Sequence, residues 1–266
     1  MKTISQTTRA WASRAAIAAG MTLTASMALT SCVAVGPAQP EIVSVIAGGG
    51  FAEALKAITP VFEAKTGHKI AARYGTAPQL LAMSADPFDV IITPEGVMDV
   101  DAARSRFTAG PLPAIAKVDI GVAVLKGATR PDIRTLAALK QTLLSAKGVS
   151  SLPASATGVK LAKIYQKLGI TEAMKTNLRA QTTVPGITEG VAKGDAQIAI
   201  FTLNILAGDP RLEVVGPIPD EVQDAVVYFG NTSSTSKKPE AAQALITFLN
   251  SPEGAAIIKA KGMTPG

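Results

Sequence analysis

The sequence predicts an α/β protein with two lobes, and three observations lead to that fold class. Runs of β-forming residues alternate with amphipathic helical patterns from residue 42 to the end of the chain. The strand runs are continuously apolar, which is typical of parallel sheets covered by helices on both faces. About ten strands are too many for one sheet in a chain of 266 residues, so two smaller lobes are expected.

The elements follow one another in a regular order after a linker at 32–41. Gly67 is the expected end of the first helix, Thr135 the N-cap of the second, and Pro252, behind a Ser251 cap, begins the second piece of the last helix. Strand patterns occupy 43–48, 69–75, 89–94, 117–127, 149–153, 196–201, 212–218 and 225–230, and helical patterns occupy 51–67, 135–148, 155–170 and 238–262.

The N-terminal 31 residues read as a targeting segment rather than as part of the fold. Three basic residues precede an uncharged apolar stretch at 15–29. The following "LTSC" at 29–32 resembles a bacterial lipobox, in which Cys32 is lipidated and becomes the first residue of the mature protein.

Two alternatives to lipidation stay open. One is ordinary signal cleavage, for instance after Ala38; the other is a transmembrane anchor, although about 15 apolar residues fall short of the roughly 20 that span a bilayer. All three interpretations place the folded part outside the cytoplasm, in the periplasm. In the first of them the lipid on Cys32 is its contact with the membrane.

Composition excludes several kinds of chemistry. Cys32 is the only cysteine and His68 the only histidine, so we expect no disulfide, thiol nucleophile, metal site or cofactor. Without the three basic residues of the targeting segment, 23 basic residues face 20 acidic ones, a net charge of +3. With no dense basic run and only 4% aromatic residues, nucleic acid is not an expected partner.

The "AGGGF" junction at 47–51 is the first candidate site. Ligands of α/β sheets lie beyond the carboxyl ends of strands, where the first turn of a helix offers unpaired N–H groups. Glycines let the backbone approach an anion closely, so Gly49, Gly50 and Phe51 are candidates for cradling a carboxylate or an oxyanion. The alternative is a tight turn that needs a positive φ.

Three later junctions repeat this strand-to-helix pattern. Thr76 follows one strand, Ser155 and Thr157 follow another, and Thr202 closes a third. Each is a candidate ligand contact, and each is also an ordinary helix N-cap residue.

Four quoted stretches carry a resemblance to a known family. They are "AGGGFAEALKAITPVFEAKTGHKI", "ADPFDVIITPE", "TVPGITEGVAKGDAQIAIF" and "SSTSKKPEAAQALITFLNSPEGAAIIKAKGM". In these the chain resembles bacterial periplasmic solute-binding proteins of the molybdate-binding-protein-like group, over nearly all of the mature chain.

The resemblance implies a type II periplasmic-binding-protein fold with the ligand cleft between the lobes. It implies a first lobe of residues 42–115 plus 225–266, a second lobe of 116–224, and closure by a hinge motion. A monomer is expected, and the implied partners are a small anion and an ABC permease.

The sequence departs from the molybdate-binding pattern at each hydroxyl position. Glycines 48–50 replace a serine, Thr76 stands without the usual run of serines, and the late tyrosine position aligns approximately with Phe201 or Thr202. A larger organic anion therefore competes with molybdate.

Side chains at two further strand ends suit an organic anion. Arg73 and Tyr74 are candidates for carboxylate recognition, against the alternative of a surface arginine on the sheet rim. Thr93 and Glu95 end a third strand; Glu95 is a candidate general base or a solvated first-turn residue.

Two functions from different classes follow from these residues. One is a binding protein that captures a small anion for an ABC importer and needs no catalytic residue. The other is a cofactor-independent periplasmic isomerase of a small tricarboxylate, similar to aconitate isomerase, with Glu95 and Tyr74 as acid/base groups. The identity of the ligand does not follow from the sequence.

Overall fold

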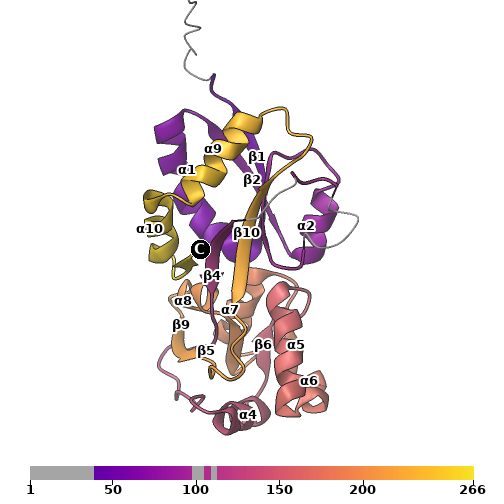
Figure 1. Cartoon of the computed structure of the whole chain (residues 1–266). Coiled ribbons are helices and arrows are strands. Elements are labelled where there is room, and N and C mark those ends of the chain that lie inside the picture. Colours follow the sequence, from indigo (N-terminus) through magenta and orange to yellow (C-terminus); the bar gives the residue numbers. More distant parts are fainter. Residues whose placement is uncertain (1–38, 98–104, 109–112) are drawn as a thin grey trace, which may run out of the picture. The chain divides into compact units, whose positions relative to one another are not determined.

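The computed structural model describes residues 39–97, 105–108 and 113–266 (Figure 1). The predicted signal segment 1–31, Cys32 and most of the linker lie outside these residues. The described chain forms two β-sheets with helices packed against them. We call the six-stranded sheet with its helices the first lobe and the five-stranded sheet with its helices the second lobe.

The first lobe is built on a sheet with the strand order β11-β4-β10-β3-β1-β2. Its central strand β1 pairs in parallel with β2 and β3, whereas β10 pairs antiparallel with β3 and β4. The strands are β1 (Ile42–Gly48), β2 (Lys69–Gly75), β3 (Val90–Pro94), β4 (Ala114–Val118), β10 (Val226–Thr232) and β11 (Thr264–Pro265).

The second lobe is built on a sheet with the strand order β7-β6-β8-β5-β9. Strand β6 pairs in parallel with β7 and β8, whereas β5 pairs antiparallel with β8 and β9. The strands are β5 (Ile120–Leu125), β6 (Val149–Ser151), β7 (Leu178–Ala180), β8 (Ile198–Thr202) and β9 (Leu212–Pro217).

The expectation of purely parallel sheets is wrong, because each sheet is mixed. The strands that carry the chain between the lobes, β5 and β10, enter their sheets against the direction of the neighbouring strands. An apolar strand is buried on both faces in either direction, so hydropathy alone does not reveal strand polarity.

The predicted strand at 117–127 is also wrong as a single element. It is two strands in different sheets: β4 ends at Val118, β5 begins at Ile120, and Asp119 lies at the crossing. The return runs from β9 through 218–225 to β10, and the Gln223 side chain bonds both the N–H and the C=O of Ile120, at 3.0 and 2.9 Å. The residue limits assigned to the lobes remain a prediction.

The helices begin where capping residues predict. Thr135 accepts a hydrogen bond from the Ala138 N–H at 3.1 Å, Gly67 ends α1 with φ of 77°, and Ser251 caps the second piece of the last predicted helix. The helical elements are η1 (Gly49–Phe51), α1 (Ala52–Thr66), α2 (Ala77–Met83), α4 (Leu136–Ser145), α5 (Ala156–Leu168), α6 (Thr171–Asn177), α7 (Val184–Ala192), α8 (Leu203–Ala207), α9 (Pro239–Leu249) and α10 (Pro252–Ala260).

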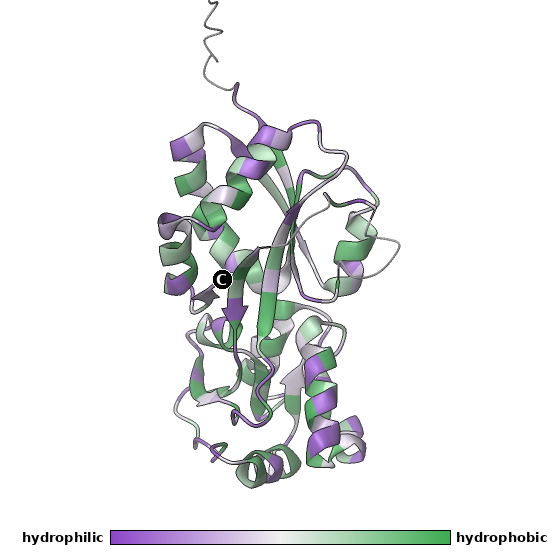
Figure 2. Ribbon diagram, in the orientation of Figure 1, coloured by the Kyte–Doolittle hydropathy of each residue, from purple (hydrophilic) through white to green (hydrophobic). Residues whose placement is uncertain are grey.

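Both sheets bury apolar side chains on both faces. In β1, Val45 packs with the core under α1 and α9, whereas the next residue, Ile46, packs with Leu80 of α2. In β8, Ile198 and Ala199 divide in the same way between the two faces. The helices show the complementary pattern, with hydrophobic residues along the side that meets a sheet and hydrophilic residues along the other (Figure 2). Because side chains on both faces of each strand are packed, the strands and the ends from which the site is built are held in place.

No helix in the described part of the chain is long and apolar enough to cross a membrane.

Candidate functional site

An inner cavity lies where strands and helices of both lobes meet. It measures about 30 Å³, and by the same measure one water needs roughly 10–15 Å³. Its lining includes the starts of η1, α2, α5 and α7, because each follows the end of a strand. The residues are Gly48, Gly49, Gly50, Gly75, Thr76, Ala77, Leu80, Pro94, Leu152, Ser155, Ala156, Thr157, Val184, Phe201, Val226 and Tyr228.

None of the residues that line the inner cavity has a charged side chain. Its polarity comes from hydroxyl groups and from the first N–H groups of helices, which have no partner within the helix and carry partial positive charge. The starts of η1 and α5 bring such groups from opposite lobes. The inner cavity is therefore suited to an anion held by neutral donors.

The three glycines at the end of β1 and the start of η1 are needed for close packing. A Cβ at Gly50 would stand 2.1 Å from the Tyr228 hydroxyl, one at Gly49 would stand 2.9 Å from Val184, and one at Gly48 would stand 3.2 Å from Pro94. None of the three has a positive φ, so the alternative of a left-handed turn is wrong. Because these glycines have no side chains, Tyr228, Val184 and Pro94 can pack directly against the backbone that forms the floor of the inner cavity.

Ser155 and Thr157 have different roles at the start of α5. The Ser155 hydroxyl accepts from the Gly158 N–H at 3.0 Å and donates to the Leu152 carbonyl at 2.6 Å, so it is occupied as an N-cap. Thr157 is buried beside the inner cavity, and no hydrogen bond within the described residues engages its hydroxyl. Thr76 is an N-cap too, and the Gln79 side chain accepts from its N–H at 2.8 Å.

Tyr228 is a cavity residue that the sequence did not reveal. It lies in β10, and its ring stands 5.6 Å from that of Phe51 between centroids. Burial raises the pKa of Tyr228, so its phenol stays protonated and can donate a hydrogen bond to an anion. The sequence does contain a tyrosine in the predicted strand 225–230, but the resemblance places the tyrosine position approximately at Phe201 or Thr202.

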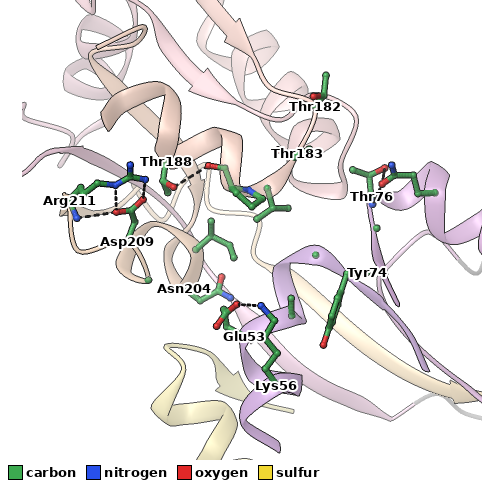
Figure 3. A pocket seen from close by; sticks show the side chains of 18 of the residues that line it. Glu53, Lys56, Tyr74, Thr76, Thr182, Thr183, Thr188, Asn204, Asp209 and Arg211 are labelled. Carbon is green, nitrogen blue, oxygen red and sulfur yellow. Dashed lines mark hydrogen bonds and ion pairs between the residues drawn. The ribbon is translucent and has the colours of Figure 1, made fainter. Parts of the chain in front are cut away.

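An outer pocket of about 770 Å³ adjoins the inner cavity, since both are lined by Gly49, Gly75, Thr76 and Val184. Figure 3 shows it, with Tyr74 from the first lobe and Thr183 and Thr188 from the second. Its remaining lining residues are Ala52, Glu53, Lys56, Gln79, Thr182, Pro185, Asn204, Ile205, Gly208, Asp209, Pro210 and Arg211.

The charged side chains of the outer pocket neutralise one another. Lys56 Nζ lies 2.7 Å from Glu53 Oε1, and Arg211 Nη2 lies 2.6 Å from Asp209 Oδ2 (Figure 3). The hydrogen bonds from Arg211 hold the pKa of Asp209 well below its usual range.

One hydrogen bond joins the lobes beside both pockets. The Asn204 side-chain amide, at the start of α8, donates to the Gly50 carbonyl at 2.8 Å. The second lobe thereby contacts the glycine floor of the inner cavity directly.

The remaining sequence candidates line neither pocket. Phe51 is buried in the first-lobe core, Thr93 donates to the Pro94 carbonyl at 3.2 Å, and the buried Thr202 hydroxyl has no hydrogen-bond partner among the described residues. Arg73 faces away from Tyr74, since neighbouring strand residues point to opposite faces, and it lies 3.4 Å from Asp86. Glu95 pairs with Lys160 at 2.6 Å. Which of the predicted residues contact a ligand stays a prediction.

Within the described ranges no three or more His, Cys, Asp or Glu side chains gather closely enough to hold a metal ion.

Two α/β lobes around a small cavity define a class of protein that encloses a solute between its halves. The family of bacterial extracellular solute-binding proteins matches residues 43–264, and the chain belongs to this family. The structure resembles the periplasmic molybdate-binding protein of Azotobacter vinelandii, with a TM-score of 0.71, 16% sequence identity, and coverage of 84% of this chain and 99% of that one; this likeness concerns the fold alone.

Two characterised relatives point to different functions. An aconitate isomerase from a Pseudomonas species is 31% identical over 237 residues, which is 86% of this chain and 90% of the relative. The molybdate-binding protein ModA of Azotobacter vinelandii is 27% identical over 242 residues, 85% of this chain and 90% of that protein.

Proposed function

We propose that this protein is an extracytoplasmic receptor that binds a small anion in the inner cavity and delivers it to an ABC importer. The observation that carries the proposal is the lining of the inner cavity: helix starts from both lobes, free hydroxyls and no charged side chain. An anion held by neutral dipoles from two lobes stabilises their closed arrangement and is released when they open.

The size of the inner cavity favours one compact anionic group. A tetrahedral oxyanion or a single carboxylate suits a space of about 30 Å³, whereas a whole tricarboxylate does not. An organic anion would place one carboxylate among the helix starts and extend into the outer pocket past Gly75 and Thr76, which line both spaces. The ligand is therefore an oxyanion, or an organic anion that places one of its anionic groups in the inner cavity.

A lipid on Cys32 would hold such a receptor at the membrane surface beside its permease. Intact-mass analysis of the protein purified from bacterial membranes tests this part of the proposal. A mass increase that maps to Cys32 supports it, and a mature chain that begins after Ala38 contradicts it.

A binding screen tests the receptor function. Molybdate, tungstate, sulfate, phosphate and a set of di- and tricarboxylates are titrated by calorimetry and by thermal unfolding. A ligand at 100 times its dissociation constant stabilises the folded state by about 2.7 kcal/mol. No stabilisation by any of these anions would contradict the proposal.

The relative at 31% identity supports a second candidate, a tricarboxylate isomerase. Of the predicted pair, Tyr74 lines the outer pocket, whereas Glu95 lines neither pocket and is paired with Lys160. Proton abstraction would require another base. Glu53 is the more exposed of the two carboxylates that line the outer pocket, and it pairs with Lys56.

Proton NMR of cis- and trans-aconitate in heavy water with the purified protein separates the two candidates. Interconversion or deuterium incorporation that is lost in Glu53→Gln supports the isomerase. Binding of aconitate without either supports the receptor.

A further inference from the structure

A buried lysine joins the two lobes next to the inner cavity. Lys160, in α5 of the second lobe, places its Nζ 2.6 Å from Glu95 Oε1 and 2.5 Å from Asp224 Oδ1. Its side chain is only 11% exposed. Glu95 directly follows β3 of the first lobe, and Asp224 lies in the segment that returns to β10. The three charges thus connect elements that are far apart in the sequence.

Each of the three residues lies within three positions in the sequence of a residue that lines the inner cavity. Glu95 is next to Pro94, Asp224 is two residues before Val226, and Lys160 is one helical turn beyond Thr157. Pro94, Val226 and Thr157 all line the inner cavity. The ion pairs therefore hold three separate walls of that cavity in one arrangement.

The sign of the charges argues against direct attraction of an anion. One ammonium between two carboxylates leaves a net negative charge beside the inner cavity. Burial acts to lower the pKa of Lys160, but its hydrogen bonds to Asp224 and Glu95 outweigh this effect and raise the pKa, so the lysine stays charged. A nearly buried charge keeps its partners close, because the loss of both would leave it without compensation.

We propose that Lys160 is a positioning residue which, with Glu95 and Asp224, forms a clasp between the lobes and sets the spacing of the walls of the inner cavity. In this proposal Glu95 helps to hold the two lobes together and does not act as a general base. It acts in the chain without ligand, and so it is tested apart from the proposed function.

Distance measurements between spin labels test the clasp directly. Labels are attached at Lys163→Cys and Glu240→Cys, two exposed positions on α5 and α9, in the full chain carrying Cys32→Ser. In Glu95→Gln and in Asp224→Asn, which keep the size of each side chain, the distance distribution should broaden and shift by more than about 2 Å, the scale of domain rearrangements in complexes. The matched control is Glu172→Gln, which removes an exposed ion pair with Lys175 inside α6 and should change nothing.

An unchanged distribution in both clasp variants would overturn the proposal, and so would an equal change in the Glu172→Gln control.

The change in anion affinity is a second readout. Its direction shows whether Glu95 and Asp224 act by positioning the cavity walls or by their charge. Both clasp variants remove a negative charge near the inner cavity, which by charge alone should tighten molybdate binding. The clasp predicts weaker binding instead, by about fivefold or more, with faster release. Tighter binding would overturn it. If the wild-type chain binds no molybdate, the oxyanion form of the proposed function fails, while the label distances still decide on the clasp.

Discussion

The inner cavity and the outer pocket share a wall but differ in how they present charge. The inner cavity offers neutral donors, namely helix starts, Thr157 and Tyr228, and none of its lining residues is charged. The outer pocket carries two cations, Lys56 and Arg211, each already paired with a neighbouring carboxylate. The comparison teaches that charged residues in a pocket do not by themselves mark the place of an anion, because paired charges attract little and fixed dipoles need no counter-ion.

The largest expected effect comes from adding a methyl group to the floor of the inner cavity. In Gly50→Ala the new Cβ would stand 2.1 Å from the Tyr228 hydroxyl and would push it into the anion's space. Overpacking together with the displaced donor should weaken anion binding by at least about 100-fold. Calorimetry on the folded variant measures this, and an affinity within twofold of wild type would remove the inner cavity as the site.

A smaller effect separates the two hydroxyls at the start of α5. Thr157→Val deletes the free hydroxyl and should weaken anion binding by about tenfold with little change in stability. Ser155→Ala deletes an N-cap and should lower the free energy of unfolding by about 1 kcal/mol, with a lesser effect on affinity.

Thr176→Val, on the exposed face of α6, is the matched control for the threonine variant, since its hydroxyl bonds only within its own helix. Equal loss of affinity in Thr157→Val and Thr176→Val would mean that neither hydroxyl reaches the ligand.

The acid stability of the outer pocket should depend on Asp209. The folded pKa of this carboxyl lies below its unfolded value because Arg211 bonds it, so its contribution is fully present above the unfolded pKa and is lost as the pH falls through the folded one. Asp209→Asn should therefore destabilise the protein at pH 7 and lose less stability than wild type on acidification to about pH 2. Urea unfolding at both pH values checks this, and parallel losses in the two proteins would contradict it.

The smallest effects should come from the paired cations. Lys56→Met and Arg211→Met should each change molybdate affinity by less than about threefold, because each cation is already paired with a neighbouring carboxylate and attracts a further anion little. A tricarboxylate that extends into the outer pocket should respond more strongly. The ratio of the two responses, measured by calorimetry, shows how far the ligand reaches beyond the inner cavity.

Much of the fold could be predicted from the sequence because strand runs and caps are local signals. The limits of β2 and the caps Thr135 and Ser251 follow from neighbouring residues alone. The break at Asp119 did not, because β4 and β5 are both apolar and only pairing with different sheets separates them. Short elements such as α8 were missed because five residues are too few for a periodic pattern.

The candidate site was predicted in part for the same reason. The glycine junction, Thr76, Ser155 and Thr157 lie at strand-to-helix junctions, and the structure brings them together around the inner cavity. Tyr228 escaped prediction because it lies inside β10 and not at a strand-to-helix junction. Both alternatives for Arg73 stayed open because one sequence does not show to which face of β2 a side chain points. The end of a strand can be predicted from neighbouring residues, whereas the face to which a strand side chain points depends on how the strand pairs in the sheet.

The central claim is that backbone N–H groups of both lobes bind one anion in the inner cavity. Amide ¹H–¹⁵N spectra recorded during a titration with molybdate, and with each carboxylate that stabilises the protein, test it most directly. The account predicts that the amide protons of residues 49–51 and of residues 156–158 shift together, with one dissociation constant. Shifts confined to one lobe, or to the lysines and arginines of the outer pocket, would contradict it.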